Sequence, residues 1–185
     1  MSIDQLDLAR LIHRSREGDA LAVEDLVRTH EAAIYRLALS MLDDPAEADE
    51  ATQDTFIAAV QRLHQYRGEA AFTTWLYAIA LNVCRRRLRR RQMRQRLPAL
   101  LQRLIGADTA PPPEQLAIAH ETDAAIWQAV KALDYKLREV IVLRYFNELR
   151  QVEIAQVLGV TDRTVRTRLH AAHEQLRLQL RETLE

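Results

Sequence analysis

The 185-residue sequence has few of the residues that interrupt helices or cross-link chains. It contains only 4 Gly and 5 Pro, and three of the prolines are consecutive at positions 111–113. This scarcity, with abundant Ala, Leu, Arg and Glu, predicts a mostly helical protein. Because Cys84 is the single cysteine, no internal disulfide can form, and its place beside an apolar stripe is typical of packing rather than chemistry.

Long apolar runs are also missing. No stretch approaches the roughly 18 uninterrupted apolar residues of a membrane span. The first residues carry Asp4 and Asp7 and lack a basic start followed by an apolar run, which argues against a secretory signal. We therefore expect a soluble, cytoplasmic protein without membrane insertion. The sequence has no Gly-rich phosphate loop and no nucleophile motif, so we expect no catalysis and no cofactor.

The charge, which is zero overall, is divided into blocks along the chain. Residues 1–60 hold 5 Arg against 13 Asp and Glu, a net charge of −8. Residues 61–105 hold 11 Arg against Glu69 alone, a net charge of +10. A basic block fits the phosphates of a nucleic acid, and an acidic block fits a basic protein surface. The two blocks thus predict two different partners.

Apolar spacing predicts helices throughout the first half of the chain. A short one ends near Gly18 and a longer one near Met41. The next has a strong start, because Asp44 can cap it, Pro45 suits its first position and Glu47 can complete a capping box.

A further helix follows the break at residues 65–69, with Thr73 or Thr74 as its cap. Its apolar stripe gives way at residues 85–91 to arginines on every face, which repel one another unless an anion is near. From about Gln92 the helical signal weakens.

We expect an all-α protein of two small helical domains joined by a flexible linker. The first domain covers residues 1–96 and the second residues 121–185. The linker, residues 97–120, includes the proline triplet and a possible short helix at 98–105. We expect no further regulatory domain after the second one.

Residues 152–169 in the second domain have the spacing of a helix-turn-helix. Ala155 is small where two helices cross, Gly159 can make the sharp turn, and Thr161 can cap the second helix. Such a helix fits the major groove of DNA, and the alternative is a helical hairpin with merely solvated arginines. The predicted DNA-binding residues are Arg163, Thr164, Arg166, Thr167, Arg168 and His170.

Three ordered segments resemble the extracytoplasmic-function class of bacterial RNA polymerase sigma factors. Residues 49–56 resemble the region-two helix of that family, and residues 72–82 with the arginines that follow resemble its promoter-melting helix. Residues 137–159 resemble region four. The resemblance covers nearly everything except the linker and the extreme termini, and it implies a factor that carries core RNA polymerase to promoters and assists their melting.

The resemblance also implies which residues meet which partner. In the family, the first helix docks on a clamp coiled coil of the largest polymerase subunit, and the second domain sits on the flap of the second-largest subunit. The residues placed on the clamp are Glu47, Asp49, Glu50, Gln53, Asp54 and Phe56. A loop in the family captures a base flipped from the minus-ten element, which requires aromatic and polar groups beside positive charge. The residues placed there are Tyr66, Arg67, Thr73, Asn82, Arg85, Arg86 and Arg89.

Departures and alternatives remain at this point. Arg86 stands where relatives often have Asp, and Ala171 and His173 where they often have Arg. His170 and His173 lie one turn apart but lack a third ligand, so we expect no metal site.

Two alternative functions also fit the sequence. The chain can be a stand-alone dimeric DNA-binding regulator or a protein-interaction module such as a polymerase-binding antagonist. Many members of the family are held inactive by an anti-sigma protein. The sequence alone does not identify such a partner for this chain.

Overall fold

The computed structural model describes residues 5–105 and 121–184, and every regular element in them is helical, which confirms the all-α prediction. In these ranges no helix combines the length and apolar character that a membrane crossing requires. The elements are α1 (Gln5–Arg16), α2 (Ala20–Leu42), α3 (Pro45–Arg62), the short turn η1 (Leu63–Gln65), α4 (Phe72–Ile105), α5 (Glu121–Ala132), α6 (Tyr135–Ile141), the π-helical turn η2 (Val142–Phe146), α7 (Gln151–Leu158) and α8 (Asp162–Leu184).

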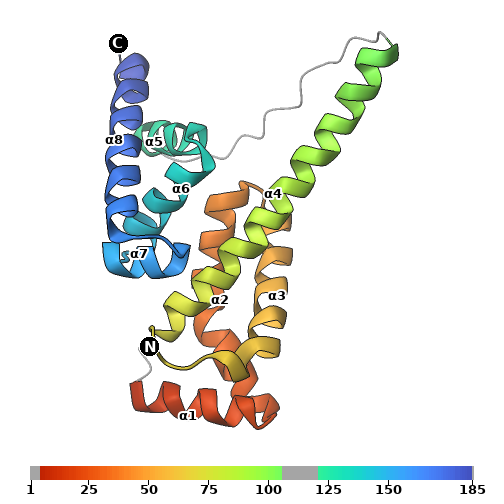
Figure 1. Cartoon of the computed structure of the whole chain (residues 1–185), viewed down its shortest axis with the longest axis vertical. Coiled ribbons are helices and arrows are strands. Elements are labelled where there is room, and N and C mark those ends of the chain that lie inside the picture. The colour runs from red at the N-terminus through yellow and green to blue at the C-terminus, as the bar shows by residue number, and fades with distance from the viewer. Residues whose placement is uncertain (1–4, 106–120, 185) are drawn as a thin grey trace.

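The first domain packs α2, α3 and α4 side by side, with α1 across one end (Figure 1). Its core includes Leu37, Met41 and Leu76, none of which is more than 1% exposed. The turn between α2 and α3 ends in the predicted cap, in which the Glu47 backbone N–H donates to Asp44 Oδ1 at 2.9 Å. The described cap has this one bond and no reciprocal bond from the Glu47 side chain, and Glu47 Oε2 is buried without a hydrogen-bond partner among the described residues.

Helix α4 differs from the prediction at both ends. It begins at Phe72, so Thr73 and Thr74 lie inside it and neither caps it. It continues to Ile105 as one helix of 34 residues, and the expected weakening at Gln92 is wrong. Arg, Gln and Leu are strong helix formers, so the helix persists where the apolar periodicity has stopped. Its last turns extend beyond α2 and α3 (Figure 1).

The second domain arranges α5, α6 and α7 against the long α8. Val140, Leu143 and Ile154 are fully buried in its core. Gly159 ends α7 in the left-handed conformation at φ +64°, as predicted. Thr161 then caps α8, because its Oγ1 accepts a hydrogen bond from the Thr164 backbone N–H at 3.2 Å.

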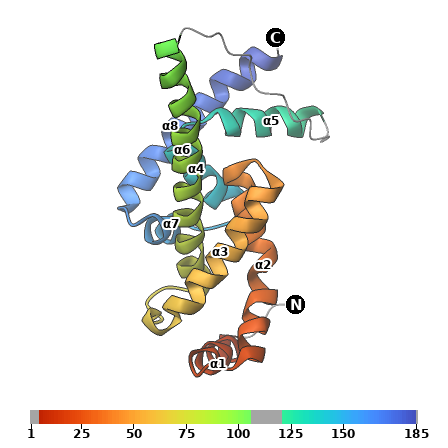
Figure 2. The same ribbon diagram turned by 90° about the vertical axis from the view of Figure 1, so that its right-hand side faces the viewer.

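The two domains are docked on each other, which the sequence did not predict. Helix α7 packs against α4, and η2 packs against α2. Figure 2 shows the second domain lying alongside α4. The buried apolar side chains of both domains form one connected cluster. The contact between the domains therefore connects their two hydrophobic cores and is not a contact between two hydrated polar surfaces.

Replacing Gly159 should destabilise the helix-turn-helix through the backbone alone. No atom outside the immediate chain lies within 4 Å of a Cβ built at Gly159, so a G159A variant meets no clash. The left-handed conformation nevertheless costs a residue with a Cβ roughly 1–2 kcal/mol. We expect G159A to lower the thermal midpoint measured by circular dichroism. G159N should fall between the two, because Asn tolerates this conformation better, and equal midpoints for all three would contradict the argument.

Candidate polymerase and nucleic-acid interfaces

The first turns of α8 present one polar side to solvent. Arg163, Arg166, Thr167 and His170 are exposed, and their spacing of three, four and seven residues places them on the same side of the helix. Arg166 donates to Asp162 Oδ2 at 3.1 Å, an exposed pair that leaves both groups accessible. This side therefore presents two arginines, a threonine and a histidine to solvent.

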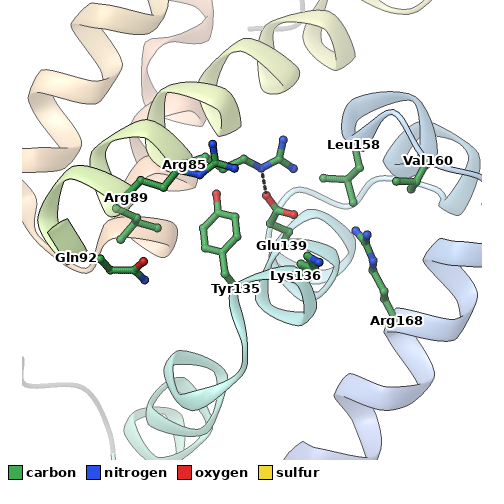
Figure 3. Close-up of a pocket in the computed structure, with 10 residues that line it drawn as sticks. Arg85, Arg89, Gln92, Tyr135, Lys136, Glu139, Leu158, Val160 and Arg168 are labelled. Carbon is green, nitrogen blue, oxygen red and sulfur yellow. Dashed lines mark hydrogen bonds and ion pairs between the residues drawn. The ribbon is translucent and has the colours of Figure 1, made fainter. Parts of the chain in front are cut away.

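Two of the predicted residues on α8 are placed differently. Thr164 is only partly exposed, and its hydroxyl shares a 2.8 Å hydrogen bond with that of Thr161, so it supports the cap. Arg168 projects away from the exposed side, into a cavity of about 370 Å³ between the domains (Figure 3). Sequence spacing placed both on the helix but did not show which neighbours surround them.

Of the two histidines considered for a metal, His173 is engaged by a tyrosine. His173 Nε2 lies 2.8 Å from the Tyr145 hydroxyl, in a hydrogen bond across the second domain. Within the described ranges no group of three or more His, Cys, Asp or Glu side chains gathers in a way that would hold a metal ion.

Helix α4 carries four of the predicted minus-ten residues on its middle turns. Asn82, Arg86 and Arg89 are exposed, and with Arg85 they line a cavity of about 380 Å³ against α3. Arg85 Nη1 donates to Asn82 Oδ1 at 3.1 Å. Arg62 of α3 lines the same cavity and adds a cation that the sequence prediction missed.

Arg85 is also bound across the domain boundary. Its Nε donates to Glu139 Oε1 at 2.6 Å, and the Glu139 side chain is only 2% exposed (Figure 3). Burial opposes the charge of Arg85, but the hydrogen bond and attraction from Glu139 outweigh this and raise its pKa. Sequence analysis missed Glu139, although an acid within the apolar residues 137–143 is the signal that could have found it.

The loop before α4 lines a third cavity, of about 980 Å³. It is lined by Tyr66, Arg67 and Thr73, the remaining predicted minus-ten residues, together with Leu8 and Ile12 of α1. Thr73 and Asn82 are nine residues apart on one helix, which corresponds to about 13 Å along its axis. The predicted set is thus brought together in two adjoining groups.

Aromatic contacts fix the loop. The Tyr66 ring centroid lies 5.4 Å from those of both Phe72 and Trp75. The Tyr66 hydroxyl donates to the Ala70 carbonyl at 2.8 Å, and Arg16 donates to the Tyr66 carbonyl. Burial raises the pKa of Tyr66, so its hydroxyl stays neutral at ordinary pH. Trp75 is half-buried in this cluster, as expected of a residue on the apolar stripe.

The outer face of α3 is acidic. Asp49, Glu50, Gln53 and Asp54 are exposed along it, as predicted, and Glu47 is partly exposed at its start. Phe56, which was also predicted to meet the polymerase, is only 9% exposed and belongs to the core, so little of its side chain is available to a partner. The reason is the helix period, which puts Phe56 one turn after the buried Thr52.

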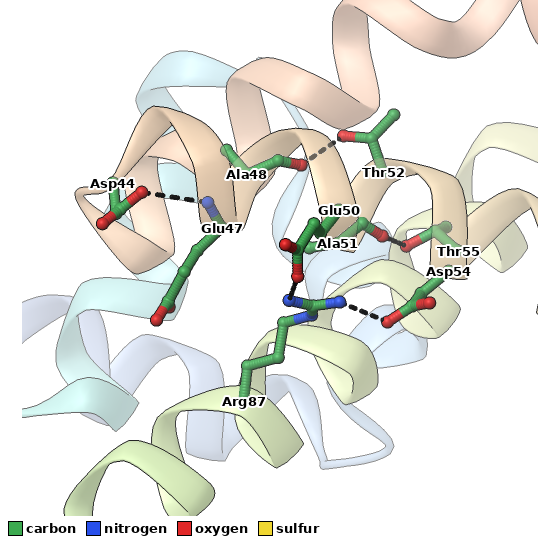
Figure 4. A network of polar contacts seen from close by, with 9 residues as sticks. All are labelled: Asp44, Glu47, Ala48, Glu50, Ala51, Thr52, Asp54, Thr55 and Arg87. Atoms are coloured by element: carbon green, nitrogen blue, oxygen red, sulfur yellow. Dashed lines mark hydrogen bonds and ion pairs between the residues drawn. The ribbon is translucent and has the colours of Figure 1, made fainter.

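Arg87 ties this acidic face to α4. Its Nη1 donates to Glu50 Oε2 at 2.7 Å and its Nη2 to Asp54 Oδ2 at 2.6 Å (Figure 4). Burial opposes the charge of Arg87, but these hydrogen bonds outweigh it and raise its pKa. The sequence prediction missed this role because nothing along the chain distinguishes Arg87 from its neighbours. Asp49 and Gln53 take no part in this network.

Two known family descriptions match the chain. "Sigma-70 region 2" matches residues 26–94, which include α3 and the middle of α4. "Sigma-70, region 4" matches residues 123–176, which include α7 and the exposed side of α8.

Relatives match over most of their length. The chain is 33% identical to the ECF RNA polymerase sigma factor SigW of Bacillus subtilis, over 96% of this chain and 99% of SigW. It is 32% identical to the RNA polymerase sigma-H factor of Pseudomonas aeruginosa, over 89% of each chain.

Solved structures agree with these matches. CnrH in complex with the cytosolic domain of CnrY superposes with a TM-score of 0.68 at 28% identity, over 93% of this chain and 96% of CnrH. The sigma factor RpoE in complex with the anti-sigma factor NepR from Bartonella quintana shares the fold, with a TM-score of 0.61 at 21% identity over 85% of this chain and 96% of RpoE. Two sigma-70 regions in order, and relatives matched from end to end, show that the chain belongs to the extracytoplasmic-function family of RNA polymerase sigma factors.

Proposed function

We propose that this sigma factor divides its partners between opposite charges: the acidic face of α3 binds core polymerase, and the arginine-bearing faces of α4 and α8 bind promoter DNA. The observation that carries the proposal is that both kinds of surface are exposed on separate elements. The family matches cover both domains, so a stand-alone regulator is not favoured.

The polymerase contact on α3 is partly electrostatic. The side chains of Asp49 and Gln53 are exposed and have no hydrogen-bond partner within residues 5–105 and 121–184, and Glu50 and Asp54 keep 68% and 48% of their side chains exposed while they bind Arg87. Complementary charge steers association and sets orientation. By resemblance to the family, the docking site is the clamp coiled coil of the largest subunit, with the second domain on the flap of the second-largest subunit.

The minus-ten element is opened by the loop and by α4. The cavity lined by Tyr66, Arg67 and Thr73 is large enough for a flipped base, and Asn82 and Arg86 lie further along the helix to track the displaced strand. Unstacking a base costs a few kcal/mol, which stacking and hydrogen bonding in a pocket offset. No bond is hydrolysed in this scheme, because binding energy from polymerase and DNA drives strand opening.

The minus-thirty-five element is bound as duplex by α8. The exposed side formed by Arg163, Arg166, Thr167 and His170 suits base edges and phosphates in the major groove. Two modest DNA sites on one chain act as a tighter one through effective concentration. An anti-sigma protein is a further proposed partner, supported by the solved complex of a protein with the same fold.

Asp49 gives the sharpest test of the polymerase surface. We expect D49K to weaken the affinity for core polymerase by about tenfold, or about 1.4 kcal/mol, mainly through slower association. D49K leaves the Arg87 network intact, because Asp49 is not part of it. E31K, which reverses an exposed acid on α2, is the matched control. Equal association rates for the two variants in surface plasmon resonance would contradict the proposal.

Arg163 gives the corresponding test of the exposed side of α8. We expect R163E to weaken holoenzyme binding to a minus-thirty-five duplex at least tenfold while core polymerase binding is retained, because it reverses a charge that faces phosphates. R181E is the matched control, 18 residues or about 27 Å further along the same helix. Fluorescence anisotropy at two salt concentrations measures the affinity of both variants for the duplex. Equal losses of affinity in R163E and R181E would mean that net charge, rather than a contact at Arg163, sets the affinity.

Transcription in vitro tests the function as a whole. The full chain, added to core polymerase on genomic promoter fragments, should confer start sites that core polymerase alone does not select. Failure of the purified chain both to bind core polymerase and to direct initiation would remove the proposal.

A further inference from the structure

The loop between η1 and α4, residues 66–71, has no regular secondary structure of its own. Side-chain contacts therefore fix its position, and they reach Tyr66 from two directions. On the side of α4, the Tyr66 ring packs against Phe72 and Trp75 with ring centroids 5.4 Å apart. Its hydroxyl donates to the Ala70 carbonyl at 2.8 Å. On the other side, the loop runs alongside α1 (Figure 1).

Arg16, the last residue of α1, binds this part of the chain through two hydrogen bonds. Its Nε donates to the Leu63 carbonyl at 3.1 Å, and its Nη2 donates to the Tyr66 carbonyl. Leu63 begins η1 and Tyr66 follows it, so both carbonyls lie where the helical segment that starts with α3 ends. Carbonyls at a helix end lack partners within the helix and carry partial negative charge, which a guanidinium neutralises. Because the guanidinium is planar and has several N–H donors, it can hold both carbonyls at once.

These two bonds connect the two walls of the cavity of about 980 Å³ in front of α4. One wall is α1, from which Leu8, Ala9 and Ile12 line the cavity, and the other wall is the loop. Ile12 is 7% exposed and anchors α1 in the core of the first domain. Within the described residues, the hydrogen bonds that join α1 to η1 and the loop both come from Arg16. Arg16 therefore sets the distance between the two walls, and with it the width of the cavity.

We propose that Arg16 is a positioning residue for base capture, which holds the loop at the width that a flipped base requires. The proposal rests on the proposed function, because it assumes that this cavity receives a base of the minus-ten element. A cavity that is formed before the base arrives loses less conformational entropy on binding, so it binds the base more tightly. In this scheme Arg16 acts through the Tyr66 carbonyl and not by touching the base.

A direct contact with DNA is the competing explanation, because Arg16 is exposed and carries a positive charge. The variant R16K separates the two explanations. Lysine keeps the charge that attracts a phosphate, but its single ammonium group does not reproduce the planar fork of the guanidinium. A positioning role predicts that R16K loses affinity for DNA as R16Q does. A phosphate contact predicts that R16K binds DNA as the wild type does.

The test measures, by fluorescence anisotropy, how holoenzyme binds a labelled single-stranded oligonucleotide with the non-template sequence of a minus-ten element. The element comes from a start site mapped by transcription in vitro, and each of its bases in turn is replaced by an abasic site. We expect R16Q to weaken binding of the intact oligonucleotide about fivefold, because the loop must then be ordered as the base enters. At one position, the captured base, R16Q should add no further loss to that of the abasic site. At the other positions the two losses in binding free energy should add, as they do for independent sites.

The matched control is R10Q on the same helix. Arg10 pairs with Asp7 at 3.6 Å, and its side chain is 78% exposed. It is not among the residues that line the cavity. We therefore expect R10Q holoenzyme to bind every oligonucleotide as the wild type does. Circular dichroism and association with core polymerase confirm that each variant is folded and assembled.

The outcomes separate this inference from the proposed function. A loss that coincides with one abasic position, in R16Q and R16K alike, supports the positioning role. Losses that add at every position, an R16K variant with wild-type affinity, an unchanged R16Q variant or an equal loss in R10Q overturn it. A wild-type holoenzyme that is indifferent to every abasic site contradicts base capture itself and overturns this inference with it. The wild type alone thus tests the proposed function, and the variants test the role of Arg16.

Discussion

The structure depends on how acidic side chains neutralise the arginines of α4. Residues 85–91 include six arginines. They lie on a helix whose apolar side packs into the hydrophobic core. Like charges so close together repel one another, and nearby carboxylates relieve part of that repulsion. Arg87 is satisfied by Glu50 and Asp54 of α3, and Arg85 by Glu139 of the second domain. Arg86, Arg89 and Arg90 remain exposed and form no ion pair with the part of the chain that the structure describes, which supports the proposed contact with a nucleic acid.

The same constraint links the three surfaces of the molecule. The acids of α3 neutralise part of α4 from one side and still face solvent, so the proposed polymerase surface and the proposed DNA surface share a helix pair. Glu139 does the equivalent from the other side, but only when the domains are docked. The acidic face of α3 and the contact between the domains are therefore electrostatically coupled to α4 through neighbouring arginines. This coupling is a matter of electrostatics, and salt will weaken its exposed parts more than its buried one.

Much of the local structure was predictable because its causes are local. The cap at Asp44 and the turn at Gly159 follow from side-chain and backbone geometry within a few residues. Predictions that required a neighbour were less reliable. The family resemblance placed Phe56 among the polymerase contacts, and the packing of the first domain leaves only 9% of it exposed. The continuity of α4 past Gln92 was missed because propensity carried the helix after the periodicity had ended.

The sequence by itself determined the two domains' helical character, the division of charge and the identity of the helix-turn-helix, because each is written in residue order and spacing. The tertiary structure alone decided which charged side chains are paired with one of opposite sign. Arg85 and Glu139 are 54 residues apart, and Arg87 and Glu50 are 37 apart. Pairs so distant in the chain leave no periodic signal, since each meets its partner only after the helices have packed. That is why Arg85 and its neighbours looked equivalent in the sequence and differ in the fold.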